Sequence, residues 1–290
     1  MPHATVEDIR LCYEETGDGP AVVFVHGGLA DRRMWDDQFA ALADHRTVRY
    51  DARGHGESDT GEGPFSGHRD LLALMDALSV ERAVLVGNSI GGGHAVEAAL
   101  AAPDRVAGMV LVSAGLVGYE WPPTFVQEAQ SRVHGTVPAE RMAVYRQGDG
   151  ADVPELDHDL DVFAGAHIRW MIAGPARTED DLPAGVWERA VAMFRARLRR
   201  MWTEDSPQET APDVPAQERL REVEAPTLVV NGLEDVPEIQ AVSDLLSRED
   251  TGIPGARRVD LPDTGHCAPL ERPEEFTGLL RSFLAEQATG

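Results

Sequence analysis

The sequence contains no lysine, so all 26 of its basic residues are arginines. Aspartate and glutamate number 50, which leaves a formal net charge of −24 at pH 7. A chain this acidic repels the phosphate backbone of nucleic acids and the anionic surface of membranes. We therefore expect neither a nucleic-acid nor a membrane partner, and we attribute the charge to solubility.

Cysteine is also scarce, with Cys12 and Cys267 far apart in a chain of 290 residues. Their spacing matches neither a disulfide framework nor a zinc site, and we expect no metal. No apolar run reaches the roughly 18 residues that a membrane span needs. Residues 1–8 lack the basic and apolar segments of a signal peptide, so the expected location is the cytoplasm.

Short apolar runs rich in valine recur along the chain and predict buried strands. They cover residues 21–25, 47–50, 83–86, 106–112, 227–230 and 257–261. Segments with helical periodicity or small residues lie between or after them, at 34–42, 67–78, 90–101 and 273–286. The alternation predicts a mostly parallel sheet covered by helices on both faces, with antiparallel strands from residues 6–15 at one edge.

Residues 118–217 interrupt this alternation, because they contain no convincing strand. The clearest helix in this stretch spans residues 186–202, with its larger apolar side chains on one stripe: Trp187, Val191, Phe194, Leu198 and Met201. Residues 203–215 are rich in proline and acidic residues, as linkers are. We predict a core formed by residues 1–117 and 218–290 and a helical cap, or lid, formed by residues 118–217.

The segment Gly87-Asn88-Ser89-Ile90-Gly91 joins a predicted strand to a predicted helix. A serine on such a sharp turn projects its hydroxyl above the carboxyl edge of the sheet. The glycines are needed because side chains at their positions would collide with the neighbouring strand and helix. We therefore predict Ser89 as a nucleophile; the alternative interpretation is a helix N-cap.

A serine hydroxyl is a weak nucleophile and needs an adjacent base. His266 follows the last predicted strand and is our candidate base. Asp235 follows the strand at 227–230 and is our candidate for orienting His266 and stabilising its cation. Glu234 is a rival for that role. The strand at 106–112 is followed by no carboxylate, which favours an acid after the later strand.

Two backbone N–H groups are candidates for stabilising the oxyanion that forms when the nucleophile attacks a carbonyl group. The first belongs to Ile90, one residue past the nucleophile. The second should come from the loop after the strand at 21–25, and is the N–H of Gly28 or Leu29. The alternative for His26-Gly27-Gly28 is a plain turn.

Taken together, these motifs resemble the α/β-hydrolase superfamily over essentially the full length of the chain. The segments that carry the resemblance are His26-Gly27-Gly28, Asp51 to Ser58, Gly87 to Gly92, Gly232 to Asp235, and Gly265 to Pro273. Within the superfamily, the chain is most similar to small cytoplasmic esterases and to 3-oxoadipate enol-lactonase-like proteins. The resemblance implies an α/β fold with a mostly parallel eight-stranded sheet, an inserted helical cap and acyl transfer to water without a cofactor. It also implies that Asp51, Arg53 and Ser58 are scaffold residues and that His26 shapes its loop.

The sequence thus predicts a serine hydrolase that cleaves an ester, thioester or lactone of a small molecule through an acyl-enzyme on Ser89. The alternatives are a cofactor-free peroxidase or perhydrolase, a C–C bond hydrolase, a cyclase, or a ligand-sensing receptor with vestigial hydrolase activity. Leu29, Trp170 and Phe194 are candidate substrate-binding residues, although aromatic residues at helical spacing also fit a cap core. The arginines between 195 and 200 fit either a solvated helix face or the attraction of an anionic substrate.

Overall fold

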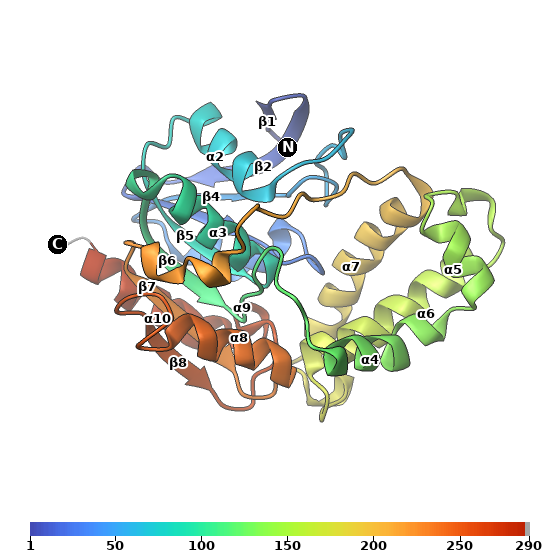
Figure 1. Ribbon diagram of the computed structural model, residues 1–290. Coiled ribbons are helices and arrows are strands. Elements are labelled where there is room, and N and C mark those ends of the chain that lie inside the picture. The colour runs from blue at the N-terminus through green and yellow to red at the C-terminus, as the bar shows by residue number, and fades with distance from the viewer. Residues whose placement is uncertain (288–290) are drawn as a thin grey trace.

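The computed structural model describes residues 1–287 and contains an eight-stranded sheet with the strand order β1-β2-β4-β3-β5-β6-β7-β8 (Figure 1). The strands are His3–Val6 (β1), Ile9–Thr16 (β2), Ala21–Val25 (β3), Arg46–Tyr50 (β4), Ala83–Asn88 (β5), Val106–Val112 (β6), Thr227–Gly232 (β7) and Arg257–Leu261 (β8). The pairs β1–β2 and β2–β4 are antiparallel, and all other pairs are parallel. The predicted mostly parallel sheet with an antiparallel edge is therefore confirmed.

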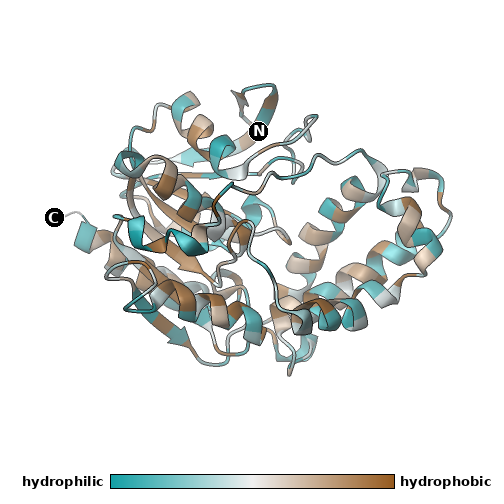
Figure 2. Cartoon of the chain, viewed as in Figure 1, coloured by the Kyte–Doolittle hydropathy of each residue, from teal (hydrophilic) through white to brown (hydrophobic). Residues whose placement is uncertain are grey.

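Helices cover both faces of the sheet, which is why the central strands are apolar along their whole length. In β3, Val22 and Phe24 belong to one apolar cluster, whereas Val23 and Val25 belong to the other. The first face is covered by Asp36–Ala41 (α1) and Pro273–Gln287 (α10), and the second by Gly67–Ala77 (α2), Ile90–Ala101 (α3) and Pro237–Ser247 (α8). Figure 2 shows hydrophobic residues concentrated on the central strands.

The chain between β6 and β7 is helical. Its helices are Pro123–Arg132 (α4), Ala139–Tyr145 (α5), Leu156–Ile168 (α6) and Val186–Thr203 (α7). In Figure 1 these four helices gather on one side of the sheet-containing part of the molecule. We name residues 118–217 the cap segment. Within residues 1–287, no helix combines the length and the apolar character needed to cross a membrane.

Helix α7 buries a different stripe from the one that its sequence pattern predicts. Its buried side chains are Val186, Ala190, Met193, Phe194, Leu198 and Trp202. Met201 is instead 38% exposed, and Trp187 is only partly buried. The face is rotated because Trp202 stacks on Tyr145 of α5, with ring centroids 4.3 Å apart. The prediction of the helix was confirmed, and Phe194 and Leu198 are buried as predicted, but the prediction was wrong for Met201.

Candidate active site

Ser89 occupies the turn between β5 and α3 in a backbone conformation that few residues other than glycine adopt, with φ 54° and ψ −128°. Its N–H donates to the carbonyl of Val112 over 3.0 Å, and its carbonyl accepts from the N–H of Gly92 over 2.9 Å. A conformation of this kind costs on the order of 1–3 kcal/mol, and these hydrogen bonds hold it in place. The turn presents the Ser89 side chain at the carboxyl edge of the sheet.

Glycine is required at both ends of the Gly87–Gly91 segment. A Cβ atom on Gly87 would lie 2.4 Å from the carbonyl oxygen of Gly91. A Cβ atom on Gly91 would lie 2.4 Å from the carbonyl oxygen of Val25 on the neighbouring strand. Both distances are far shorter than a van der Waals contact, which confirms the steric reason predicted for these glycines.

The structure brings His266 and Asp235 together from the loops that follow β8 and β7. His266 Nδ1 lies 2.8 Å from Asp235 Oδ2, and both side chains are buried. The other carboxylate oxygen accepts a 2.7 Å hydrogen bond from the N–H of Val236. Because an ionised carboxylate only accepts hydrogen bonds, the proton of this pair sits on Nδ1 and the lone pair of His266 is on Nε2. Among residues 1–287, Nε2 has no hydrogen-bond partner.

Glu234, the rival acid, lies in the same loop but not against His266. Its N–H donates to the carbonyl of Thr264 over 2.8 Å, which holds the loops after β7 and β8 side by side. Its side chain is half-buried, whereas that of Asp235 is fully buried. The arrangement of the two loops therefore places the carboxylate of Asp235, and not that of Glu234, against His266.

Ser89 and His266 line a shared space of about 10 Å³, which we name the catalytic cavity. Its walls are Gly27, Leu29, Ala30, Asn88, Ser89, Ile172, Ala190, Met193, His266, Cys267 and Leu270. A volume of this size holds about one water molecule. Three of the wall residues, Ile172, Ala190 and Met193, come from the cap segment, so the cap closes this space from above the sheet edge.

The N–H groups of Gly28 and Ile90 donate no hydrogen bond to any of the described residues. The peptide between Gly27 and Gly28 is fixed by His26, whose Nδ1–H donates to the carbonyl of Gly27 over 2.8 Å. Because the carbonyl and the N–H of one peptide point in opposite directions, this bond also directs the N–H of Gly28. His26 Nε2 accepts from the N–H of Ala52 over 2.9 Å, so the ring must be neutral. Burial lowers the pKa of His26, which keeps it neutral.

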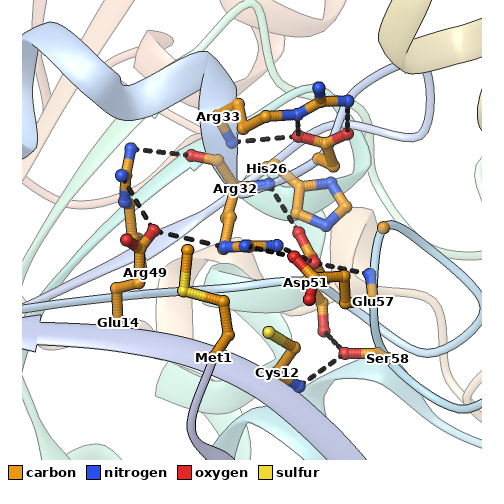
Figure 3. Close-up of polar contacts among 12 residues, drawn as sticks. Met1, Cys12, Glu14, His26, Arg32, Arg33, Arg49, Asp51, Glu57 and Ser58 are labelled. Carbon is orange, nitrogen blue, oxygen red and sulfur yellow. Dashed lines mark hydrogen bonds and ion pairs between the residues drawn. The ribbon is translucent and has the colours of Figure 1, made fainter.

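A polar network around Asp51 holds the loop that follows Gly28 (Figure 3). Asp51 accepts from the N–H of Arg32 over 2.9 Å and of Glu57 over 2.8 Å, and it pairs with the Arg32 guanidinium. Ser58 Oγ donates to the carbonyl of Asp51 over 2.6 Å and accepts from the N–H of Cys12 over 2.8 Å. The internal hydrogen bonds predicted for Asp51 and Ser58 are present, and their role is to hold the loops beside the site.

Arg177 of the cap segment and Glu271 brace the loop that carries His266. Glu271 accepts hydrogen bonds from the N–H of Gly265 over 3.0 and 3.1 Å, one residue before His266. Arg177 Nη2 donates to Glu271 over 2.7 Å, and Arg177 Nη1 donates to the carbonyl of Asp263 over 3.1 Å. Burial raises the pKa of Glu271, whereas Arg177 opposes that rise. The sequence did not point to Arg177, and Glu271 was included only as part of the segment Gly265 to Pro273.

The cap segment also contacts the loop that carries Asp235. Gly174 follows the π-helical turn Arg169–Ala173 with φ 101°, and a Cβ atom there would lie 1.9 Å from the carbonyl oxygen of Glu234. Only glycine permits both this backbone conformation and this approach. Residues 172–177 therefore pack against both loops that supply the acid and the candidate base.

A larger cavity of about 440 Å³, which we name the cap cavity, lies next to the catalytic cavity. It is lined by Gly28, Leu29, His55, His134, Met142, Arg146, Phe163, His167, Phe194, Arg197, Leu198, Met201 and Trp202. Leu29 thus contacts both cavities and Phe194 contacts the larger one. Trp170 contacts neither, because it packs between Phe125 and His167, with ring centroids 5.0 and 6.2 Å away.

Cys267 follows His266 but is buried and in the thiol form. Burial raises its pKa well above the usual value for a thiol, and its Sγ donates to Asn88 Oδ1 over 3.7 Å. A thiol in this state is a poor nucleophile. Within the described residues 1–287, no three His, Cys, Asp or Glu side chains cluster in a way that would hold a metal ion.

Comparison with known proteins places this geometry in a family. Residues 22–279 match the alpha/beta hydrolase family. The chain belongs to that family. An uncharacterized protein of Mycobacterium bovis is 34% identical over 172 residues, which are 54% of this chain and 50% of that protein. The chain therefore matches about half the length of that relative.

Solved structures of similar proteins extend over nearly the whole of this alpha/beta hydrolase. An N-acyl homoserine lactone degrading enzyme is 30% identical with a TM-score of 0.63, over 97% of this chain and 100% of that one. The enol-lactonase from Burkholderia xenovorans is 26% identical with a TM-score of 0.68, over 98% and 100%. A hydrolase from Pseudomonas aeruginosa is 28% identical with a TM-score of 0.69, over 97% and 96%. These likenesses support a hydrolase.

Proposed function

We propose that this alpha/beta hydrolase cleaves an ester, thioester or lactone of a small molecule through an acyl-enzyme on Ser89. The observation that carries the proposal is the His266–Asp235 contact of 2.8 Å beside the same cavity as the strained Ser89. The likeness to an N-acyl homoserine lactone degrading enzyme and to an enol-lactonase supports the ester and lactone class.

Acylation begins when Ser89 Oγ attacks the carbonyl carbon of the substrate. His266 Nε2, which has a free lone pair, takes the hydroxyl proton, and Asp235 stabilises the resulting imidazolium. The unpaired N–H groups of Gly28 and Ile90 would receive the oxyanion. The imidazolium then protonates the leaving alcohol, thiol or lactone oxygen, which leaves an ester on Ser89.

Deacylation repeats these steps with water as the nucleophile. The catalytic cavity has room for about one water molecule between Ser89 and His266. His266 Nε2 takes a proton from that water, and the hydroxide attacks the acyl carbon. The tetrahedral intermediate collapses to the free acid, and the proton returns to Ser89 Oγ.

The test is the Ser89→Ala variant, assayed with short-chain p-nitrophenyl esters. Removal of the nucleophile is expected to lower kcat by about 10⁴-fold or more, with an unchanged thermal midpoint. Ser282→Ala, on the exposed face of α10, serves as the matched control and should retain full activity. A fluorophosphonate should label Ser89 in the native chain. Undiminished turnover by Ser89→Ala would refute the mechanism.

A further inference from the structure

Arginines that are buried or partly buried in this protein pair with carboxylates, as charges must if their removal from water is to be offset. The pairs are Arg32–Asp51, Arg53–Asp70 and Arg177–Glu271. Arg197 on α7 is the exception. Its Nη1 donates to the carbonyl of Gly54 over 2.8 Å, and no carboxylate of residues 1–287 lies within ion-pair distance of it.

Arg197 is partly buried and has no counter-ion within ion-pair distance among residues 1–287. Burial lowers the pKa of Arg197 to about 10, and the nearby Arg200 adds to this effect. Glu204 opposes it from a distance, but its carboxylate already accepts hydrogen bonds from Arg200 and from Thr60 Oγ1. The guanidinium therefore stays charged at neutral pH while lacking a counter-ion that would offset its desolvation.

Arg197 lines the cap cavity, whose charged groups are all basic. The second arginine in its walls is Arg146, and no aspartate or glutamate lines it, although acidic residues outnumber basic ones by 50 to 26 in the chain. His167 adds an Nδ1 atom that is buried without a hydrogen-bond partner among the described residues. Burial lowers the pKa of His167 to about 3, so it offers a neutral ring to a ligand.

The remaining walls of the cap cavity restrict what such a ligand looks like. His55 donates its Nδ1–H to the carbonyl of Arg53 over 2.9 Å, so its Nε2 only accepts. An anionic group in this cavity would therefore be repelled by His55 Nε2 and attracted by Arg197. The other walls are apolar side chains: Leu29, Met142, Phe163, Phe194, Leu198, Met201 and Trp202. They suit an apolar chain that ends in an anionic group.

The cap cavity reaches the candidate active site through Gly28 and Leu29. Gly28 carries one candidate oxyanion donor, and Leu29 also lines the catalytic cavity. We infer that Arg197 binds a carboxylate at the far end of the acyl chain, so the substrate is an ester or lactone of an acid that carries a second, ionised carboxylate. This inference rests on the proposed function, because it assumes that the acyl carbon sits at Ser89.

Matched pairs of esters test the inference. Monoethyl adipate and monoethyl suberate carry the anion, whereas ethyl adipamate and ethyl suberamate replace it with a neutral amide of the same shape. The native enzyme should prefer the anionic member of at least one pair by roughly tenfold or more in kcat/KM. Arg197→Met should remove that preference by lowering kcat/KM for the anionic ester roughly 10- to 100-fold, with less than about a threefold change for the amide.

Arg199→Met is the matched control, because Arg199 lies on the same helix but pairs with Asp157 at the surface. Arg199→Met should leave kcat/KM for the anionic ester and kcat/KM for the amide within about twofold of the native values. Arg197→Met should lower the thermal midpoint by no more than a few degrees, because it removes one hydrogen bond, to the carbonyl of Gly54, and no carboxylate partner. Equal hydrolysis of both members of each pair by the native enzyme, or an equal loss of both in Arg197→Met, would overturn the inference.

Direct binding separates this inference from the proposed function. Calorimetric titration of adipate and suberate into Ser89→Ala should give binding that disappears in the double variant with Arg197→Met. If the native enzyme hydrolyses no ester, the proposed function fails, and binding that depends on Arg197 still supports the anion site. If hydrolysis proceeds but neither dicarboxylate binds more tightly with Arg197 than without it, the anion site fails alone.

Discussion

Asp235 and Glu234 are adjacent carboxylates with different surroundings. The backbone turn after β7 directs Asp235 inward, where both of its oxygens accept hydrogen bonds. Glu234 stays half-buried in the same loop. At the scale of single residues, the site depends on which carboxylate points toward His266, and that carboxylate is Asp235.

Replacing each carboxylate by its amide should separate their roles. Asp235→Asn is expected to lower kcat by about 10⁴-fold, because an amide favours the wrong tautomer of His266 and cannot stabilise its cation. Glu234→Gln should change kcat by less than about threefold, since it is not in contact with His266. Steady-state kinetics on p-nitrophenyl esters measures both. Equal losses in the two variants would contradict the assignment of Asp235.

Some of these residues could be predicted from the sequence and others could not. Ser89 and His266 follow strands at positions where few other nucleophiles or bases are available, so the sequence could single them out as candidates, and both line the catalytic cavity. The choice between Asp235 and Glu234 depends on a backbone turn that both residues share. Arg197 could not be distinguished from Arg195, Arg199 and Arg200, because only the packing of α7 decides which of them faces a cavity.

At the scale of secondary-structure elements, the cap segment and the loop after β8 are linked by the ion pair between Arg177 and Glu271. The two residues are 94 positions apart, so no local pattern predicts their contact. The strands, by contrast, were predictable because apolar residues that are buried on both faces form continuous runs. The buried face of α7 was not, because it depends on Tyr145 of another helix.

Breaking this pair should destabilise the protein in a pH-dependent way. Arg177→Met leaves Glu271 buried without a cation, which raises the pKa of Glu271 further and disfavours its charged form. The loss in free energy of unfolding is expected to be about 3–5 kcal/mol at neutral and alkaline pH, where Glu271 must ionise. The loss should be smaller in acid, where Glu271 is protonated.

Urea unfolding at an acidic and an alkaline pH measures this loss in free energy of unfolding. The kcat of Arg177→Met should also fall, because the loop that carries His266 is no longer held by the contact between Arg177 and Glu271. Arg272→Met is the control, since the Arg272 side chain is 38% exposed and its Nη2 lies 3.9 Å from Asp263 Oδ2. It should cost less than about 1 kcal/mol. A loss in Arg177→Met that is larger in acid than in alkali would contradict the assigned role of Glu271.

At the scale of the whole molecule, five buried or partly buried histidines make folding sensitive to acid. Burial lowers the pKa values of His26, His55, His68, His134 and His167. In the unfolded chain each has a pKa of about 6.5, so below that pH the unfolded state binds protons that the folded state does not. The free energy of unfolding should therefore fall as the pH falls, by up to about 1.4 kcal/mol per pH unit for each histidine.

Glu97 and Glu271, whose pKa values burial raises, act in the opposite sense and offset part of this loss close to pH 5. Urea unfolding between about pH 8 and pH 5 measures the net effect. His167→Gln should give a shallower dependence of stability on pH than the native chain, because one of these histidines is gone. A stability that does not change over this range would contradict the burial of neutral histidines.

The small volume of the catalytic cavity bears on which nucleophile completes the reaction. With the cap side chains as they stand, the space beside Ser89 has room for about one water molecule. The departure of an alcohol and its return as a nucleophile both require Ile172, Ala190 and Met193 to move aside, because both use this same space, whereas the entry of water does not. The share of transesterified product formed in methanol or glycerol should therefore report how often the cap segment stands open between the two steps.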